Sequence, residues 1–328
     1  MTTLITGATG FVGSALAHKL LARGETVRVL VRPAADRRNL EDLRVEIVAG
    51  DLMDPASLAA AVKGCDTLFH VAADYRLWVP DPAPMFKANV EGTRALMRAA
   101  ANAGVRRIVY TSSVATLLPH PDNSPAREED AGSAADMVGA YKQSKHAAEV
   151  VVRQMIAEGL PAIITHPSTP VGPRDIKPTP TGKMVVDAAN GRMPAYVDTG
   201  LNVVHVDDVA EGHILALEQG RPGRGYILGS ENLSLASILA TVAELTDRPA
   251  PRVKLRHGLV MPIAGLAELW ARATGTEPFA TREAVKLARK TMFFSSERAI
   301  QELGYRPRPA REAIADAIVW FREHGYVR

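Results

Sequence analysis

The sequence has few of the features that mark disulfide-rich, membrane-spanning or strongly charged proteins. Its 328 residues include one cysteine, Cys65, which excludes an intrachain disulfide and is typical of a reducing compartment. The longest apolar run, residues 259–270, is interrupted by Pro262 and Glu268 and is too short to cross a membrane. The net charge is only +3, with a pI near 9.0, so we expect no nucleic-acid partner.

Signals for secretion and for metal binding are also lacking. The first expected strand begins within a few residues of Met1, which leaves no room for a signal peptide, so we expect a cytoplasmic protein. The nine histidines show no spacing typical of a metal site, and we expect no metal. His205 and His213 are predicted to be structural. The composition, 47% apolar and 23% charged, is that of an ordinary globular protein with one large or two modest domains.

What the first half does contain is a regular alternation of strand-like and helix-like segments. This alternation predicts an α/β fold, in which a doubly wound parallel sheet of the Rossmann type is covered by helices on both faces. The expected strands are residues 4–5, 26–31, 44–48, 67–71, 107–111 and 162–165, and the expected helices are 11–23, 55–63, 85–103 and 140–157.

The second half is less regular. Two long segments rich in proline or charge, residues 118–136 and 167–183, interrupt the alternation and are typical of functional loops. Helical patterns dominate beyond them. We therefore predict a dinucleotide-binding domain over residues 1–166 and a smaller, mostly helical substrate-binding lobe over 167–328, with 201–225 returning to the first domain.

The first expected turn from strand to helix has the pattern G-x-x-G-x-x-G. Glycines allow a sharp turn and a close approach of the backbone to a bound group. The N–H groups and the positive dipole end of the following helix suit a pyrophosphate. The residues predicted to bind a dinucleotide here are Gly7, Thr9, Gly10, Phe11, Val12 and Gly13.

Charge at the end of the second expected strand bears on the choice of cofactor. Arg32 follows Gly13 by nineteen positions, where this architecture places a group against the adenosine ribose. A guanidinium favours a 2′-phosphate, so we predict NADP, with NAD as the alternative. Arg37 and Arg38 could add to this effect, unless all three are simply solvated. The other expected cofactor contacts are Asp51 and Leu52 at the adenine, and Ala72 and Ala73 near the backbone of the fourth strand's end.

Tyr141 and Lys145 lie four residues apart on an expected helix and therefore share a face. An ammonium one turn away lowers the pKa of a phenol from about 10 toward the range useful for acid–base chemistry. Ser112 and Ser113 follow the fifth strand, where a hydroxyl could donate to a substrate oxygen. By themselves, a tyrosine and a lysine at this spacing are more often an exposed surface pair, and two serines after a strand more often belong to a turn. Together with the glycine turn, in this order on strand ends, they would rarely arise by chance.

In this order the motifs resemble those of the extended short-chain dehydrogenase/reductases, the NAD-dependent epimerase/dehydratase family, over nearly the whole chain. The similar segments are TGATGFVG (6–13), GDL (50–52), NVEGT (89–93), TSS (111–113), YKQSK (141–145) and HVDDVA (205–210). The resemblance implies that Tyr141 is the acid/base and that Lys145 binds ribose and lowers the pKa of Tyr141. It also implies that Ser113, rather than Ser112, polarises the reacting C–O group.

The same resemblance implies further roles. Asn89 would support the hydrogen bonding of the site, and Pro167 and Thr169 would line the nicotinamide. Residues 85–103 and 140–157 would form the helices of a homodimer interface.

Within the family, four segments resemble the bacterial hopanoid-associated sugar epimerases, a group that is itself similar to dihydroflavonol-4-reductases. They are HVAADYRLW (70–78), HPSTPVGPRDIKPTPTGK (166–183), NGRMPAYVDTGLN (190–202) and ARKTMFFSS (288–296). The resemblance implies a sugar, nucleotide-sugar or polyol substrate linked to hopanoid biosynthesis. Arg32 suits a net reductase that exchanges NADP better than an epimerase that retains NAD, so a dihydroflavonol-4-reductase-like NADPH ketone reductase is the alternative. Val114 and Ala115 disfavour a dehydratase, which needs an acid pair there.

Substrate contacts are less clearly marked. Arg174 and Lys177, in the proline-rich loop, could meet a phosphorylated or nucleotide-linked sugar. Tyr75, Arg76 and Trp78 could form a stacking or apolar wall. Residues 259–270 could rest against a lipid, although packing within the second lobe is favoured. A redox-sensing regulator that binds NADP without turnover is a further alternative, disfavoured because the tyrosine and lysine are both present.

Overall fold

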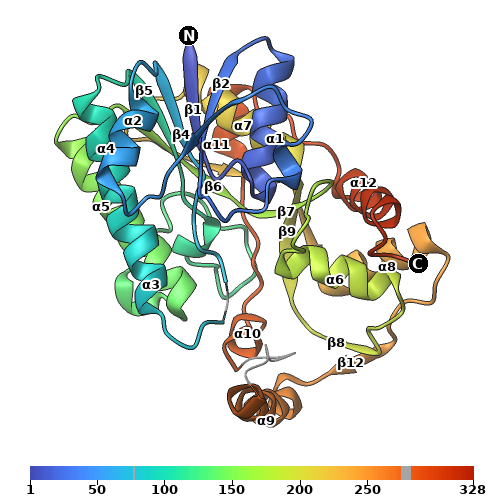
Figure 1. The fold of residues 1–328 in the computed structure, drawn as a ribbon. Coiled ribbons are helices and arrows are strands. Elements are labelled where there is room, and N and C mark those ends of the chain that lie inside the picture. The colour runs from blue at the N-terminus through green and yellow to red at the C-terminus, as the bar shows by residue number, and fades with distance from the viewer. Residues whose placement is uncertain (77, 275–281) are drawn as a thin grey trace.

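The computed structural model describes residues 1–76, 78–274 and 282–328 (Figure 1). Its centre is a seven-stranded sheet in the order β10-β6-β5-β4-β1-β2-β3, parallel at every pairing. The doubly wound Rossmann-type sheet predicted from the sequence is confirmed. The strands are β1 (Thr2–Thr6), β2 (Thr26–Val31), β3 (Glu46–Ala49), β4 (Thr67–His70), β5 (Arg107–Thr111), β6 (Ala162–Pro167) and β10 (Gly225–Leu228).

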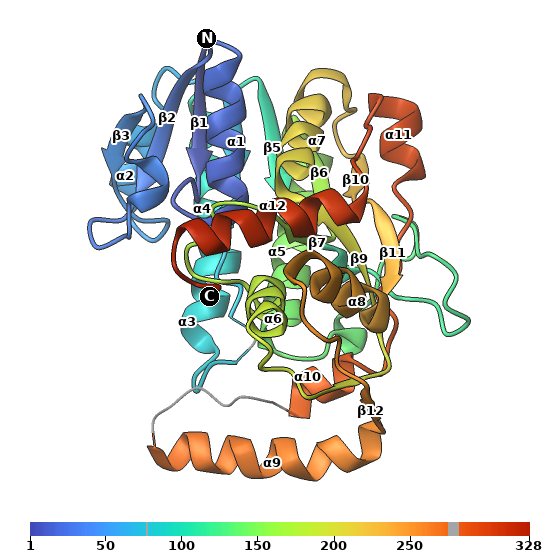
Figure 2. The ribbon, with the colours of Figure 1, turned by 90° about the vertical axis from the view of Figure 1, so that its right-hand side faces the viewer.

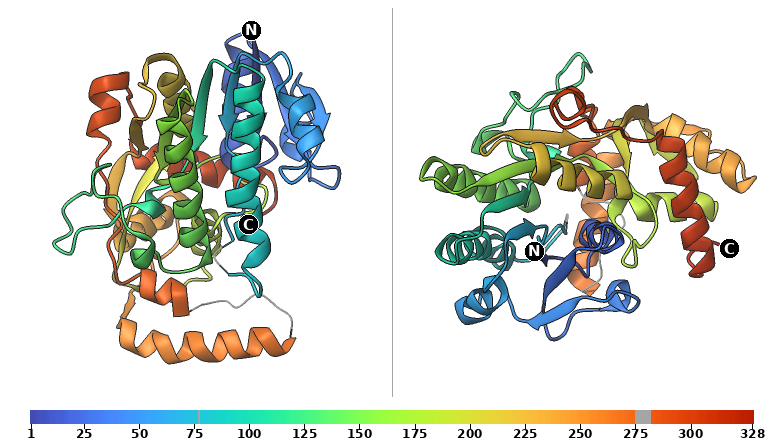
Figure 3. Two further views of the ribbon diagram at one scale, coloured as in Figure 1. Left: turned by 90° about the vertical axis from the view of Figure 1, so that its left-hand side faces the viewer. Right: turned by 90° about the horizontal axis from the view of Figure 1, so that it is seen from above.

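Helices cover both faces of this sheet, which is why its inner strands are apolar along their length. On one face lie α2 (Pro55–Val62), α4 (Thr93–Asn102) and α5 (Ala140–Ala157), the last two side by side in green and teal in the left panel of Figure 3. On the other face lie α1 (Phe11–Ala22), α7 (Val206–Gln219) and α11 (Glu297–Leu303). Adjacent strand residues point to opposite layers: Leu4 packs with Leu96 beneath α4, and Ile5 packs with Leu16 of α1.

The second lobe is built mainly of helices and also contains two small sheets that the sequence did not predict. One pairs β7 (Thr169–Val171), β9 (Gly200–His205) and β11 (Glu231–Ser234), and the other pairs β8 (Ala195–Val197) with β12 (Val253–Leu255). The helices packed on the first are α6 (Pro180–Ala189), α8 (Leu235–Thr246) and α12 (Ala310–Glu323). Most of these strands are three or four residues long, too short for a recognisable alternation.

The two lobes interleave along the chain. Helix α7 packs on α1, strand β10 completes the central sheet, and α11 packs on both α7 and β10. The return to the central sheet therefore continues past residue 225, the end of the segment expected to return. The boundary at residues 166 and 167 stays a prediction.

The helix expected over residues 85–103 is interrupted. It consists of α3 (Ala83–Phe86), a π-helical turn η2 (Lys87–Gly92) and α4. π-Helical turns are frequent at functional sites. The 3-10 turns are η1 (Arg38–Leu40), η3 (Val114–Thr116) and η4 (Ala134–Asp136).

The loop over residues 118–136 covers the exposed edge of the central sheet. The carboxylate of Glu128 accepts a hydrogen bond from the backbone N–H of Ile227 in the edge strand β10, at 2.8 Å. Ala126 also forms a bridge with Phe294. The loop thus satisfies part of an edge that could otherwise pair with another chain.

Two helices lie at the periphery. Helix α9 (His257–Thr274) runs along the border of the molecule farthest from the start of β1, next to α10 (Arg282–Leu287) (Figures 1 and 2). It is on the side toward which the parallel strands run. Within the described residues no helix is long and apolar enough to cross a bilayer.

Candidate active site

The glycine turn can be formed only by glycines at two of its positions. Gly7 has a φ of +79°, and a Cβ there would lie 2.7 Å from the backbone nitrogen of Ala72. A Cβ on Gly13 would lie 2.2 Å from the carbonyl oxygen of Gly7. The turn is therefore folded back on itself and pressed against the chain that leaves β4. Ala72 is small where it meets this turn, and its contact with the cofactor stays a prediction.

The first turn of α1 is open to an external acceptor. Other helices are capped by their own side chains, as α2 is by Asp54, α6 by Thr179 and α8 by Ser234. Gly10, at the start of α1, has no side chain to do this, and the first turn contains no acidic residue. N–H groups without internal partners, at the positive end of the helix dipole, fit the diphosphate of a dinucleotide.

The turn's other predicted residues are placed around it. Phe11 and Val12 are half-buried and pack against the core between α1 and the sheet. The carbonyl oxygen of Thr9 accepts a hydrogen bond from the Asn39 amide at 3.2 Å. The same amide reaches the carbonyl oxygen of Arg174 at 3.2 Å, so the proline-rich loop is tied to the glycine turn.

Arg32 lies at the expected adenosine end, directly after β2. Its side chain is exposed, and no ion pair engages it within the described part of the chain. Arg38 is different, because it pairs with Asp36 at 2.6 Å and holds the pKa of that carboxyl at about 2. Arg32 and the equally exposed Arg37 are thus without an ion pair in the described part of the chain, whereas Arg38 already has a partner.

The residues expected at the adenine follow β3. Asp51 accepts from the backbone N–H of Met53 at 2.8 Å and so shapes its own turn. Leu52 is half-buried, and a Cβ on Gly92 would lie 2.9 Å from its Cβ. Ala73 is half-buried after β4.

Tyr141 is half-buried in the first turn of α5. Burial raises the pKa of its phenol, while a hydrogen bond with Ser113 lowers it. Ser113 follows β5, and its Oγ also accepts from the backbone N–H of Ala115 at 3.1 Å. Ser112 is buried and instead donates to the Glu149 carboxylate. The structure therefore places Ser113 beside the phenol and directs Ser112 away from it.

Lys145 is 4% exposed and its ammonium is held by the end of β5. Its Nζ donates to the carbonyl oxygen of Thr111 at 2.8 Å and lies 4.9 Å from the centre of the Tyr110 ring. Burial lowers the pKa of Lys145 to about 8, although Glu149 opposes this shift. The ammonium is thus protonated at neutral pH. That it lowers the pKa of Tyr141 stays a prediction, since the resolved causes there are burial and Ser113.

The sequence reasoning missed Glu149. Its carboxylate joins the buried side chains of Ser112, Thr116 and His166, which together with Lys145 and Glu149 form what we call the floor of the site. Its carboxylate accepts from Thr116 Oγ1 at 3.0 Å and from Arg153 Nε at 2.8 Å, besides Ser112, and lies 3.2 Å from His166 Nε2. Burial raises the pKa of Glu149, but His166, Arg153 and Ser112 together bring it below its usual range. Glu149 follows Lys145 by one further helical turn, so the repeated spacing of four was the available signal.

A buried neutral histidine ties the strand ends together. His70 Nδ1 lies 2.7 Å from Thr6 Oγ1, and Nε2 lies 2.8 Å from Thr93 Oγ1. Burial, with Lys145 as the second cause, lowers the pKa of His70 to about 3. Asn89, on the π-helical turn, accepts from the backbone N–H of Asp74 at 2.7 Å and donates to Ser144 Oγ at 3.0 Å. It thereby joins the loop after β4 to the helix that holds Tyr141.

Two other histidines serve the scaffold. The His205 ring accepts from the backbone N–H of Asp207 at 3.0 Å and begins α7. His213 Nε2 lies 2.9 Å from Thr111 Oγ1 and 3.0 Å from Thr165 Oγ1, bridging two strands. Among the described residues, no three side chains of the metal-binding types lie together.

The expected nicotinamide-lining segment contains a second missed group. Pro167 is buried at the end of β6, and Thr169 begins β7. Between them the Ser168 hydroxyl is buried with no hydrogen-bond partner in the described chain. A buried polar group of this kind is rare unless something bound satisfies it.

The structure places Arg174 and Lys177 near the segments that follow β2 and begin α7. The Arg174 guanidinium pairs with Asp207 at the start of α7. Lys177 is exposed and near enough to Asp36 to lower the pKa of that carboxyl, so it lies by the loop after β2. Both therefore lie on the cofactor's expected adenosine side. That they meet a phosphorylated or nucleotide-linked sugar stays a prediction.

The other expected substrate contacts follow β4. Tyr75 is 44% exposed and Trp78 is half-buried. Arg76 is exposed and pairs with Asp74 at 2.5 Å. Position 77, inside the same motif, lies outside the described residues. Their contact with a substrate stays a prediction.

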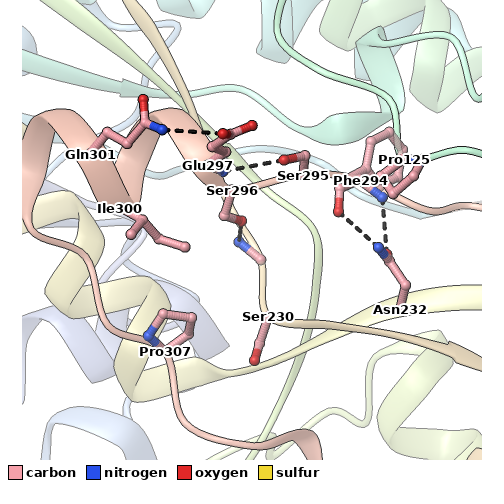
Figure 4. Close-up of a pocket in the computed structure, with 11 residues that line it drawn as sticks. Pro125, Ser230, Asn232, Phe294, Ser295, Ser296, Glu297, Ile300, Gln301 and Pro307 are labelled. Atoms are coloured by element: carbon pink, nitrogen blue, oxygen red, sulfur yellow. Dashed lines mark hydrogen bonds between the residues drawn. The ribbon is translucent and has the colours of Figure 1, made fainter.

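A cavity of about 400 Å³ lies apart from these groups, between the β10–β11 connection and the start of α11 (Figure 4). None of the predicted catalytic or cofactor residues lines it. Its polar side chains bond to one another and to the backbone: Gln301 donates to Glu297 at 3.1 Å, and Asn232 donates to the carbonyl oxygen of Phe294 at 3.1 Å. The cavity therefore lies between two segments of the chain, residues 229–232 and 294–307, that hydrogen bonds hold together.

Comparison with known proteins relates the chain to one family. Residues 3–229 match the model of the NAD dependent epimerase/dehydratase family. A putative dihydroflavonol 4-reductase from Synechocystis sp. is 42% identical, over 99% of this chain and 95% of its own. Sterol demethylase protein B from Methylococcus capsulatus is 36% identical over the full length of both. The crystal structure of gox2253 is 57% identical, with a TM-score of 0.90, over 100% of this chain and 99% of that one.

Proposed function

The chain belongs to the NAD dependent epimerase/dehydratase family of oxidoreductases, and from this premise we propose that it is an NADP-dependent ketone reductase or alcohol dehydrogenase. The observation that carries the proposal is that Ser113 lies near enough to the Tyr141 phenol to lower its pKa, while the buried ammonium of Lys145 follows one helical turn along α5. These groups follow β5 and begin α5, at the strand ends where open parallel sheets bind ligands.

The chain's own residues fit a dinucleotide. A nicotinamide cofactor supplies or accepts the hydride when it is bound. The uncapped first turn of α1 would hold the diphosphate, and the unpaired Arg32 would bind a 2′-phosphate. The buried Ser168 hydroxyl, which has no partner within the described residues, would bond to the nicotinamide half.

The phenol acts as the acid in reduction. Because burial raises its pKa, Tyr141 is protonated at neutral pH and can give its proton to a substrate carbonyl oxygen. Ser113 donates a hydrogen bond to the same oxygen and so holds it in place. The ammonium of Lys145 favours the phenolate that remains, and in the oxidation direction the same phenolate takes the proton back.

We further propose that the substrate is a largely apolar, polycyclic ketone or secondary alcohol. The names of two relatives that match over nearly their full length refer to a dihydroflavonol and a sterol, both polycyclic. A hopanoid-linked polyol belongs to the same class. A sugar epimerase is the second candidate, favoured by the segments that resemble hopanoid-associated sugar epimerases.

Measuring net nicotinamide oxidation separates these candidates. We expect the protein to oxidise NADPH with a polycyclic ketone, with NADPH preferred over NADH, and we expect Arg32→Ala to weaken NADPH binding while leaving NADH binding unchanged. Conversion of a nucleotide-sugar into its epimer, without net cofactor change and without turnover of any ketone, would establish the epimerase instead.

A further inference from the structure

Helix α9 exposes a stripe of large apolar side chains. Leu259, Leu266 and Trp270 are 65%, 68% and 70% exposed, although the other leucines whose side chains the structure describes are buried or half-buried. At 3.6 residues per turn, these three positions lie within about 40° of arc on one helix face. Contiguous exposed apolar surface of this kind marks an interaction site.

Other sides of the helix are already packed. Ala264 is fully buried and Ala267 is 6% exposed, where α9 meets α10 and the buried Val285. The stripe therefore does not belong to a loosely placed helix that could turn inward. Its side chains are exposed, and the helix that carries them lies at the border of the molecule (Figures 1 and 2).

The segment that contains the stripe is basic in sequence, although Lys254 is paired with Asp198 and Arg282 with Glu268. Residues 252–290 contain eight lysines and arginines against three glutamates, a net charge of +5, whereas the whole chain carries +3. Arg256 is exposed at the start of α9. Arg289 is also exposed. It lies near the start of α9, because His257 Nε2 is 3.0 Å from the carbonyl oxygen of the neighbouring Ala288. Within the described chain neither arginine has an ion pair.

We propose that α9 docks the protein on the surface of an anionic phospholipid membrane. An amphipathic helix with a narrow apolar stripe and a basic border lies in the headgroup region, where the stripe is buried and the cations meet lipid phosphates. A second copy of the chain fits the stripe poorly, because two like-charged borders would be brought together. The helix lies on the surface and does not cross the bilayer.

Docking would turn the reacting end of the protein toward the lipid. The parallel strands run toward α9 and α10 (Figure 1), so Tyr141 and Ser113 lie at the end of the sheet nearest this helix. For the proposed apolar substrate, the membrane would then be the source. This consequence rests on the proposed function, whereas the docking itself does not.

Co-sedimentation with vesicles tests the docking. Full-length protein would be mixed with vesicles of phosphatidylcholine alone and of phosphatidylcholine with about a third phosphatidylglycerol. We expect binding to the anionic vesicles, a blue shift of Trp270 emission on binding, and at least about tenfold weaker binding after L259S/L266S/W270S or R256E/R289E. The matched control is V150S/I300S/V319S, whose side chains are 41%, 49% and 53% exposed elsewhere. It should bind as the unchanged protein does.

Several outcomes would overturn the docking proposal. These are no binding to either vesicle, equal binding by the stripe variant and the control, or a stripe substitution that alters only the mass of the protein in solution. Thermal unfolding of each variant identifies misfolding, and R256E/R289E keeps the test decisive if the triple variant misfolds. Turnover of a soluble ketone without vesicle binding would retain the proposed reaction and reject the docking.

Discussion

The floor of the active site and the outer helix α9 depart from ordinary burial in opposite directions. The floor encloses charged groups, with Lys145 at 4% and Glu149 at 5% exposed, whereas α9 leaves Trp270 70% exposed. Burying a charge and exposing a large apolar surface both cost free energy. A chain selected only for stability would expose the charged Lys145 and Glu149 and bury the apolar Trp270.

The difference between the two regions lies in where compensation comes from. On the floor, hydrogen bonds from Ser112, Thr116 and Arg153 satisfy the Glu149 carboxylate within the protein. No part of the described chain covers the stripe on α9. Buried polar groups that bond to one another indicate a preorganised site. Exposed apolar side chains that nothing in the described chain covers indicate a binding partner outside the protein.

The largest expected effect is on the chemistry of the floor. Tyr141→Phe removes the proton donor while keeping the ring, so turnover should fall by about 10²–10⁴-fold. Steady-state rates with a polycyclic ketone and NADPH measure this, and NADPH binding by fluorescence should be retained. Tyr196→Phe, on β8 in the second lobe, is the control and should keep its rate. Undiminished turnover in the Tyr141 variant would remove the phenol from the mechanism.

The next effect is on the stability of the same floor. Glu149→Ala leaves Ser112, His166 and Arg153 without their shared partner, so the free energy of unfolding should fall by about 3–5 kcal/mol. Denaturant unfolding measures the loss. Glu149→Gln, which keeps an acceptor oxygen and the side-chain shape, should lose less. A loss under about 1 kcal/mol for alanine would mean that the network adds little.

Acid should lower the free energy of unfolding, by an amount that follows from the protons that buried groups take up or release on unfolding. Burial lowers the pKa of His70 to about 3 and of His213 to about 4, from 6.5, so unfolding near pH 5 takes up about two protons. Burial raises the pKa of Asp175 to about 6, from 3.8, so the same unfolding releases about one proton there. These three groups together take up about one proton, so they lower stability by about 1.4 kcal/mol per pH unit of acidification, and the pKa values of His18 and His205, which burial also lowers, add to this loss.

Asp175→Asn sharpens this count. Without the opposing proton, the slope of the unfolding free energy between pH 6 and pH 4 should rise by about one proton. Denaturant unfolding across this range measures both slopes. An unchanged slope in the variant would show that Asp175 is already ionised in the folded protein at pH 5.

The smallest effect is expected at α9. L259S/L266S/W270S should change the free energy of unfolding by less than about 0.5 kcal/mol per substitution, because these side chains are already in water. Thermal and denaturant unfolding without lipid measure it. A loss of several kcal/mol would show that the stripe stabilises the fold and would erase the contrast with the floor.

Regular patterns predicted the framework well. The expected segments 26–31, 107–111 and 140–157 coincide with β2, β5 and α5, since each is an uninterrupted run bounded by turn residues. The short strands β8, β11 and β12 were missed, because three or four residues carry no distinct period. The π-helical turn at Asn89 was also missed, since a one-residue change in helical pitch leaves the apolar pattern almost intact.

The order of the glycine turn, the serine pair and the Tyr/Lys pair determined, without any structure, the type of fold and the chemistry to expect. Local spacing suffices there, because strand ends and helix faces place such residues by geometry alone. Tertiary structure decided the rest. It placed Ser113 near the Tyr141 phenol and Ser112 on Glu149, paired Arg174 with Asp207, and left the stripe of α9 exposed among the described residues. These outcomes depend on contacts between segments far apart in the chain, which no local pattern encodes.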